Sequence, residues 1–190
     1  MNCELRYVEI NLKVGCKNAC KYCPQDVYLK NYAGSTKEMR LDDFKRMLVN
    51  IPTTYALQFA GKSEPFLNND FPDMIIYAKS LGYKVILFTT FVGFTEEIAN
   101  KLCEANVQID EAHYHIFNGP SFDAKEFAKK KSLFLRKINP VWSSTLIVSN
   151  PVGLAGNLFS IEPNSGTMKS ICYRAYNNSI DVDGSIYFCC

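Results

Sequence analysis

The chain has 190 residues, of which 47% are hydrophobic and 21% charged, and its formal net charge is +2 at pH 7. This length suits one domain with a real hydrophobic core, and the apolar fraction excludes a disordered chain. No apolar run approaches the roughly 18 residues of a membrane-spanning helix, and the N-terminus lacks the apolar region of a signal peptide. We therefore expect no membrane partner, and the small net charge gives no reason to expect nucleic acid.

Strands and helices are predicted to alternate along most of the chain. Apolar and β-branched runs predict strands over 5–12, 55–60, 85–90, 107–117 and 141–148. Helical periodicity predicts helices over 41–51, 71–81, 95–106 and 123–137. Thr95 and Asp123 are expected N-caps, and Gly82 is expected to end the second helix. This alternation predicts an α/β fold with a parallel sheet, but periodicity leaves open whether the sheet is an open barrel or a doubly wound layer.

The pattern changes after residue 149. Residues 151–166 hold two prolines and three glycines, which predict a loop-rich linker. Short strands over 179–183 and 185–188 flank Asp183-Gly184, a pair typical of a hairpin turn. We therefore divide the chain into residues 1–150, the α/β unit, and residues 151–190, a linker with a small β element.

The chain has eight cysteines, and they are not evenly spread. Without a secretory signal we expect a cytoplasmic, reducing compartment, where clustered cysteines favour metal binding or catalysis over disulfides. Cys103 stands alone in a predicted helix and is expected to be a buried, inert thiol. Cys3 is expected to be buried in the same way or simply exposed.

Residues 16–23 read CKNACKYC and directly follow the first predicted strand. Thiolates at Cys16, Cys20 and Cys23 can hold three corners of a cubane iron–sulfur cluster, which leaves one iron free for another ligand. Lys17 and Lys21 add positive charge that favours thiolates. Zinc binding and chance spacing are the alternatives, although structural zinc prefers four ligands.

The motif Cys16-x-x-x-Cys20-x-x-Cys23, with Tyr22 before the last cysteine, resembles the signature of radical S-adenosylmethionine (radical SAM) enzymes. The resemblance implies a partial (βα)6 TIM-like barrel, a [4Fe-4S] cluster on the three cysteines and S-adenosylmethionine (AdoMet) on the fourth iron. In that family the reduced cluster cleaves AdoMet to a 5′-deoxyadenosyl radical, which takes a hydrogen atom from the substrate. An electron donor such as flavodoxin or ferredoxin is implied as a partner.

Three further segments extend the resemblance to about residues 7–148. Gly61-Lys62-Ser63-Glu64-Pro65 resembles the G-x-G-E-P element, whose backbone binds the methionine amino group, with Ser63 in place of the second glycine. Thr89-Thr90-Phe91 stands where relatives often have T-N-G, and Asn118-Gly119 where they often have a D-G or N-G turn. The cofactor contacts that the resemblance implies are at Tyr22, Gly61, Ser63, Glu64 and Thr90.

The C-terminal cysteines resemble the opening of a SPASM or twitch extension, in which a hairpin between two cysteines begins an auxiliary iron–sulfur site. Cys189 and Cys190 are adjacent, and successive strand side chains point to opposite faces, so we expect Cys172 and Cys189 as the usable ligands. The chain ends where further ligands would follow, so we expect a fragment. The alternatives are a vestigial extension, ligands from another chain, or cysteines buried in a small hairpin core.

Two other groups of residues have two interpretations each. His113 and His115 share one side of a predicted strand with Glu111, and they either line a barrel interior or form a polar pair satisfied by neighbours. The lysines of residues 129–131 are expected on a solvated helix face, where Glu126 can pair with Lys130.

Together these features predict a radical SAM enzyme that abstracts hydrogen from an unidentified substrate, either a peptide or protein or a small alcohol or sugar. One alternative is a glycyl-radical activase, which uses the same chemistry. The other is a non-catalytic metal-binding protein.

Overall fold

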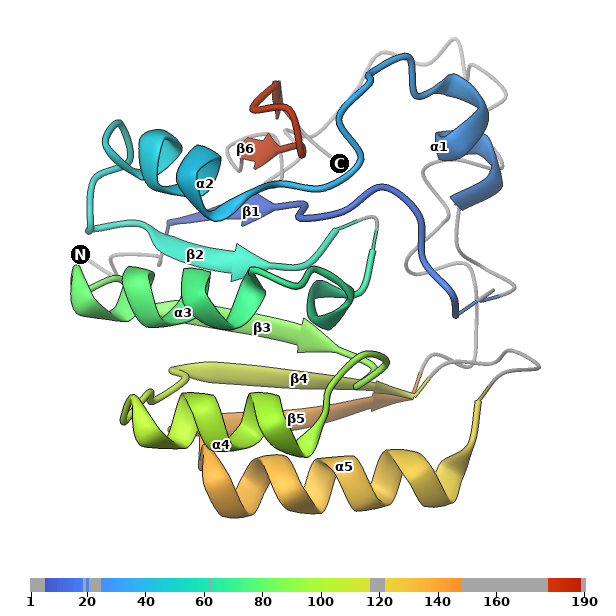
Figure 1. Ribbon diagram of the computed structural model, residues 1–190, viewed down its shortest axis with the longest axis vertical. Helices are drawn as coiled ribbons and strands as arrows, with labels where there is room; N and C mark the ends of the chain where they lie inside the picture. The colour runs from blue at the N-terminus through green and yellow to red at the C-terminus, as the bar shows by residue number, and fades with distance from the viewer. Residues whose placement is uncertain are drawn as a thin grey trace, which may run out of the picture.

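The protein is built on a single sheet whose strands alternate along the chain with helices (Figure 1). The computed structural model describes residues 6–18, 20, 25–61, 63–116, 122–147 and 178–188. The strands are β1 (Tyr7–Ile10), β2 (Ala56–Phe59), β3 (Val85–Thr89), β4 (Glu111–Ile116), β5 (Trp142–Ile147), β6 (Asn178–Ile180) and β7 (Ile186–Phe188). The helices are α1 (Gln25–Asn31), α2 (Leu41–Leu48), the 3-10 helix η1 (Pro65–Leu67), α3 (Phe71–Ser80), α4 (Glu96–Glu104) and α5 (Ala124–Lys137).

The sheet has the strand order β5-β4-β3-β2-β1-β6-β7. Strands β1 to β5 are neighbours in chain order, and all of their pairings are parallel. This confirms the predicted α/β fold, and the arrangement is consistent with a partial TIM-like barrel. Strand β6 pairs in parallel with β1, at the edge opposite β5, and β7 returns antiparallel to it. The C-terminal hairpin therefore continues the main sheet.

The two faces of this sheet have different compositions. One face, which we call the helix face, is covered by α2, α3, α4 and α5, all on the near side in Figure 1. Its strand residues are apolar and buried: Val8, Ile10, Leu57, Phe59, Val85, Leu87, Ala112 and Tyr114. The opposite face, which we call the inner face, carries the alternate strand positions, and most of these are polar or aromatic and only half-buried: Glu9, Gln58, Phe88, Glu111, His113, His115 and Ser144.

Aromatic rings dominate the core on the helix face. The ring of Phe59 on β2 lies 5.9 Å from that of Phe44 on α2 and 5.0 Å from that of Phe71 on α3, centroid to centroid. All three side chains are fully buried. Burial of one such side chain contributes about 1.5–3 kcal/mol, so these contacts hold α2 and α3 against the sheet.

The predicted helix boundaries agree with the structure where a capping residue marks them. The Thr95 hydroxyl accepts a hydrogen bond from the backbone N–H of Ile98 (3.3 Å) at the start of α4. The Asp123 carboxylate accepts from the N–H groups of Lys125 (2.8 Å) and Glu126 (3.1 Å) at the start of α5. Both predicted N-caps are confirmed.

Two sequence-based expectations about this part of the chain are wrong, and one helix was missed. The strand predicted over 107–117 begins only at Glu111, because residues before it serve the connection: the Asp110 carboxylate accepts from Lys79 (2.6 Å) and from the N–H of Val85 (2.8 Å). Cys103 is exposed, because α4 turns Ala99 and Leu102 to the core instead. Helix α1 was not predicted, since seven residues are too few to display a helical period.

Within the described part of the chain, no helix has both the length and the apolar character needed to cross a membrane.

Candidate active site

The Glu64 carboxylate connects the loops that follow β2 and β3. Its side chain is only 3% exposed. One oxygen accepts from the hydroxyl of Thr89 (2.7 Å), and the other accepts from both the N–H and the hydroxyl of Thr90 (2.6 Å each). It also caps η1 by accepting from the N–H of Phe66 (3.4 Å). Burial raises the pKa of Glu64, and the hydrogen bonds from Thr90 and Thr89 oppose that rise.

The cysteine loop after β1 joins the same assembly. Asn18, two residues beyond Cys16, donates from its side-chain amide to the Thr90 hydroxyl (2.8 Å). Burial raises the pKa of the Cys16 thiol, while the backbone N–H groups of Asn18 and Glu64 donate toward its sulfur and oppose the rise. Cys16 therefore lies against the start of η1. The structure brings together three of the predicted site segments, at Cys16, at Glu64 and at Thr90.

Gly61 and Ser63 lie in the loop between β2 and Glu64. Gly61 has φ of +93°, a conformation that favours glycine. A Cβ atom placed on Gly61 would lie 3.3 Å from Oε1 of Glu9 and 3.6 Å from Cβ of Asn11, so the loop passes close over the end of β1. The Ser63 hydroxyl is buried and has no hydrogen-bond partner among the described residues. It is thus available to a bound group.

The other predicted ligands are only partly within the described residues. Cys20 is described, and its side chain is half-buried. Tyr22, Cys23, Cys172, Cys189 and the turn at Asn118-Gly119 lie outside the described residues. Among the residues that are described, no three Cys, His, Asp or Glu side chains are grouped as metal ligands. The full cysteine motif therefore stays a prediction.

The available residues fit the group that the motif implies. Two of the three thiols, those of Cys16 and Cys20, are half-buried, and thiols are the soft ligands that iron–sulfur clusters require. The buried hydroxyl of Ser63 and the backbone of Gly61 add polar groups in the loop beside them. Because the pKa of Cys16 is raised, binding of a cluster there must displace a proton.

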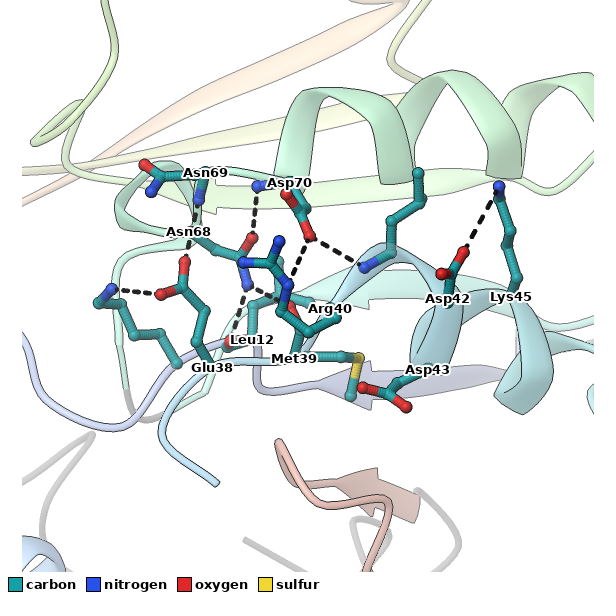
Figure 2. A network of polar contacts seen from close by, with 12 residues as sticks. Leu12, Glu38, Met39, Arg40, Asp42, Asp43, Lys45, Asn68, Asn69 and Asp70 are labelled. Atoms are coloured by element: carbon teal, nitrogen blue, oxygen red, sulfur yellow. Dashed lines mark hydrogen bonds and ion pairs between the residues drawn. The ribbon is translucent and has the colours of Figure 1, made fainter. Parts of the chain in front are cut away.

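A second polar network links the segment after η1 to the segments before α2 and after β1 (Figure 2). The buried side-chain amide of Asn68 donates to the carbonyls of Leu12 (2.9 Å) and Met39 (2.8 Å). Glu38 accepts from the backbone N–H of Asn69 (3.0 Å) and pairs with Lys13 (3.0 Å). These bonds fix the segment after η1 to the chain that leads from β1 into the cysteine loop. None of these side chains was singled out from the sequence, because single asparagines carry no recognisable spacing.

Polar side chains line the inner face beside β1. Glu9 accepts from Gln58 on β2 (3.0 Å) and from Ser179 on β6 (3.3 Å). Asp181, which follows β6, accepts from Asn11 (2.7 Å) and from the Tyr28 hydroxyl of α1 (3.0 Å). Burial and the neighbouring Asp181 carboxylate raise the pKa of Tyr28. These contacts hold α1 and β6 to the end of β1.

Histidine and aromatic side chains line the inner face at β3 to β5. The ring of His113 stacks on Phe88 (4.3 Å between centroids), and its Nδ1 lies 3.0 Å from the Ser144 hydroxyl. Its Nε2 lies 3.7 Å from the Glu111 carboxylate. His113 is thus satisfied by neighbours, as one of the two interpretations predicts. His115 is not: within the described part of the chain its Nε2 is buried without a partner, and burial lowers its pKa to about 4.

The predicted lysine face of α5 is partly wrong. Lys130 does pair with Glu126 (3.5 Å), as predicted, but it also donates to the carbonyl of Phe91 (3.2 Å). Lys131 donates to the Thr145 hydroxyl on β5 (2.7 Å). These two side chains attach α5 to the loop after β3 and to β5, because their long stems reach past the helix surface.

A cavity of about 670 Å³ lies between α2 and the β6–β7 hairpin. It is lined by apolar side chains such as Met47, Ile180 and Ile186, and by Asp43 and Arg46. None of the predicted site residues lines it. The cavity is therefore separate from the candidate active site.

Comparison with known proteins shows the fold. No protein-family model matches the chain. The chain is similar to BtrN in complex with AdoMet and 2-DOIA, with a TM-score of 0.67 and 17% identity over 100% of this chain and 74% of BtrN. It is also similar to SuiB of Streptococcus suis bound to S-adenosylmethionine, with a TM-score of 0.53 and 12% identity over 97% of this chain and 60% of SuiB.

At these identities the likeness concerns the fold. The chain has the α/β fold of BtrN and SuiB, a parallel sheet with alternating helices that is consistent with a partial TIM-like barrel. This resolves the choice between barrel and layer that periodicity left open. Both neighbours were solved with AdoMet.

Proposed function

We propose that this chain is a radical SAM enzyme that binds a [4Fe-4S] cluster through Cys16, Cys20 and Cys23 and cleaves AdoMet reductively. The observation that carries the proposal is the convergence of three loops at the carboxyl ends of β1, β2 and β3, joined by Glu64, Thr90 and Asn18. Ligands of parallel α/β sheets bind at that edge. The AdoMet that BtrN and SuiB hold supports the same chemistry in this fold.

The residues have separate roles in this proposal. The three thiols hold the cluster, and the bound cluster with AdoMet supplies the radical that abstracts hydrogen. Gly61 and Ser63 offer the backbone and hydroxyl for the methionine part of AdoMet, and Tyr22 packs near the adenine. The Glu64 carboxylate acts indirectly, because all its described contacts are to Thr89, Thr90 and Phe66. It positions the Gly61–Ser63 loop and Thr90.

The substrate faces the inner side of the sheet in this proposal. The half-buried polar side chains there suit a small polar molecule, such as an alcohol or sugar, or a peptide side chain. We keep as predictions an auxiliary cluster at Cys172 and Cys189, a flavodoxin or ferredoxin as electron donor, and a cytoplasmic location.

Anaerobic reconstitution with iron and sulfide tests the proposal. The wild-type chain should bind about four irons and four sulfides for the first cluster. With dithionite and AdoMet it should form 5′-deoxyadenosine. The variants Cys16→Ala, Cys20→Ala and Cys23→Ala should each lose the cluster absorbance and the product.

Cys103→Ala is the matched control, because Cys103 is exposed on α4 and lies outside the cysteine motif. It should retain iron and product at the wild-type level. Iron that persists in all three loop variants, or zinc bound in place of iron, contradicts the proposal and favours a non-catalytic metal-binding protein. Product formed only with a large partner protein that then carries a glycyl radical would favour an activase.

A further inference from the structure

The positive charge of the chain is concentrated in the segment that contains the cysteine loop. Residues 13–37 contain five lysines, one aspartate and no other charged residue, so this segment has a net charge of +4. The whole chain has a net charge of +2, so the remaining residues together are slightly acidic. Such an asymmetry between one segment and the rest of the chain indicates a negatively charged partner.

Three lysines of this segment offer their charge to solvent. Lys17, Lys30 and Lys37 are exposed. None of them forms an ion pair with an acidic side chain of the described residues. The Nζ of Lys37 lies 4.5 Å from the centroid of the Tyr32 ring, a contact that orders the side chain without neutralising its charge. The three charges are therefore available to a partner.

Two of these lysines lie at the base of the cysteine loop. Lys17 directly follows Cys16 in the chain. The backbone N–H of Val14 donates to the carbonyl of Lys37 (2.8 Å), so Lys37 lies opposite the segment that leads into Cys16. A protein that contacts these lysines would come close to the first thiol of the motif.

The third lysine lies beside an exposed apolar side chain. Leu29 of α1 is 45% exposed, and Lys30 follows it. A Cβ atom placed on Gly15 would lie 4.0 Å from Cδ2 of Leu29, so α1 contacts the residue before Cys16. Helix α1 lies at the end of the molecule to which the strands point, apart from the helix layer (Figure 1). An apolar centre with a charged rim is typical of protein interfaces.

The chemistry of this surface selects the class of partner. Residues 13–37 contain no arginine, the residue that most often contacts phosphates and bases, which argues against nucleic acid. An acidic protein matches both the lysines and the exposed leucine. The proposed function needs one electron from outside the chain for each AdoMet that is cleaved. Electron-transfer complexes are typically small, below about 1,200 Å², and depend on electrostatic steering.

We propose that Lys17, Leu29, Lys30 and Lys37 form the docking surface for an acidic electron-transfer protein. The inference rests on the proposed function, because the electron is delivered to the cluster that the cysteine loop would hold. In that step one electron leaves the reduced donor protein and reduces the cluster. No bond forms or breaks, and no proton is transferred.

Isothermal titration of an oxidised flavodoxin of net negative charge into the reconstituted protein measures docking separately from catalysis. A ferredoxin is titrated in the same way. The variant is the double reversal Lys30→Glu with Lys37→Glu, and Lys17 is kept because it belongs to the cysteine loop. The matched control is Lys125→Glu with Lys129→Glu, because both lysines are exposed on α5 and form no ion pair within the described part of the chain. Carbodiimide cross-linking, which joins lysine amines to carboxylates, locates the contact.

The double reversal should weaken binding of the donor protein by about tenfold or more at low ionic strength. The difference should nearly disappear in about 1 M salt, where the Debye length is about 3 Å. The control pair should bind as wild type does, and cross-links from wild type should include Lys30 or Lys37. Formation of 5′-deoxyadenosine should fall in the double reversal when flavodoxin is the reductant, but not with dithionite, a small molecule that needs no docking surface.

The inference is overturned if wild type binds neither flavodoxin nor ferredoxin, if the double reversal binds as tightly as wild type, or if the control pair weakens binding equally. An RNA oligonucleotide that displaces the donor protein from Lys30 and Lys37 with higher affinity also overturns it. A wild-type chain that holds no iron, or forms no product with dithionite, contradicts the proposed function instead, and the titration still decides whether the surface binds. If the double reversal does not fold, as judged by circular dichroism, Lys30→Gln with Lys37→Gln is measured in its place.

Discussion

Phe59 and Gln58 are neighbours on β2, yet they belong to different parts of the molecule. Phe59 faces the helices, is fully buried and contacts two other phenylalanine rings. Gln58 faces the inner side, is half-buried and donates to Glu9. The same contrast holds along β1 and β4. The helix face supplies the apolar burial that stabilises the fold, whereas the inner face keeps polar groups that cost stability unless they are paired.

The largest expected change in the free energy of unfolding comes from truncating Phe59, and Gln58 is its direct comparison. Phe59→Ala leaves a cavity between β2, α2 and α3 and should lower the free energy of unfolding by about 3–5 kcal/mol. Gln58→Ala removes one half-buried hydrogen bond and should cost less than about 1.5 kcal/mol. Equilibrium urea unfolding measures both. Equal losses for the two variants would contradict the assignment of the faces.

The next effect concerns Glu64, where the inner face meets the loops. Glu64→Ala leaves the hydroxyl of Thr89 and the N–H and hydroxyl of Thr90 without their acceptor, which should cost about 1–3 kcal/mol. The same urea experiment measures it. Thr95→Ala, which removes an exposed cap, is the control and should cost no more than about 1 kcal/mol.

Glu64 also predicts a pH dependence of stability. Its pKa in the folded state lies above the ordinary value of 4.5, so between the two values the folded state binds more protons than the unfolded state. The stability contributed by this group is therefore complete below pH 4.5 and declines as the pH rises toward the folded-state pKa. The isosteric Glu64→Gln variant has no such titration. Its stability relative to wild type should improve with rising pH, and a constant difference across the range would contradict the raised pKa.

For His115 we expect the opposite dependence of stability on pH. Its pKa falls from 6.5 to about 4 on folding, so the unfolded state binds more protons between those values. Wild type should lose stability as the pH falls from 6.5 to 4, by at most about 1.4 kcal/mol per pH unit from this residue. His115→Gln should show a shallower decline in the same window. His113→Gln is a useful comparison, because burial lowers its pKa while the Glu111 carboxylate opposes that change.

The smallest effect lies on the surface of the helix layer. Asp123→Ala removes the acceptor for two backbone N–H groups of α5 and should cost about 1 kcal/mol. Asp123→Asn should recover most of that loss, because asparagine caps nearly as well. Thermal unfolding resolves the two variants. A loss larger than that of Glu64→Ala would mean that α5 depends on its cap more than on its packing against Phe91 and Tyr114.

Phe91 shows how a motif position can keep its backbone conformation although its residue type differs from the motif. It stands where the T-N-G element that this segment resembles has glycine, and its φ of +62° is the left-handed conformation that glycine adopts most easily. The strain persists because the ring is buried against Tyr114 and Phe134. Local pattern alone gave no reason to expect a phenylalanine in that conformation. Only the surrounding rings explain it.

Periodicity and capping chemistry were enough to predict most of the fold. The alternation of apolar strands and amphipathic helices determined the α/β class, and Thr95, Asp123 and Gly82 marked helix ends where the structure has them. Hydrophobic periodicity and capping residues depend only on neighbours along the chain, so a single sequence is enough to detect them. Sequence patterns missed helix α1, the late start of β4 and the exposure of Cys103. Short segments and single residues are too small to show a hydrophobic period.

The sequence by itself was enough to identify the cysteine motif and the loops in which the site residues lie. Both signals depend only on residue types and their spacing along a short segment. Only the tertiary structure decided what those residues do to one another. In the folded chain the Glu64 carboxylate accepts hydrogen bonds from Thr89 and Thr90. Strand β6 pairs with β1, so that Asp181 orients the side chain of Asn11 across a separation of 170 residues. Such contacts depend on strand order and register, which no local pattern specifies.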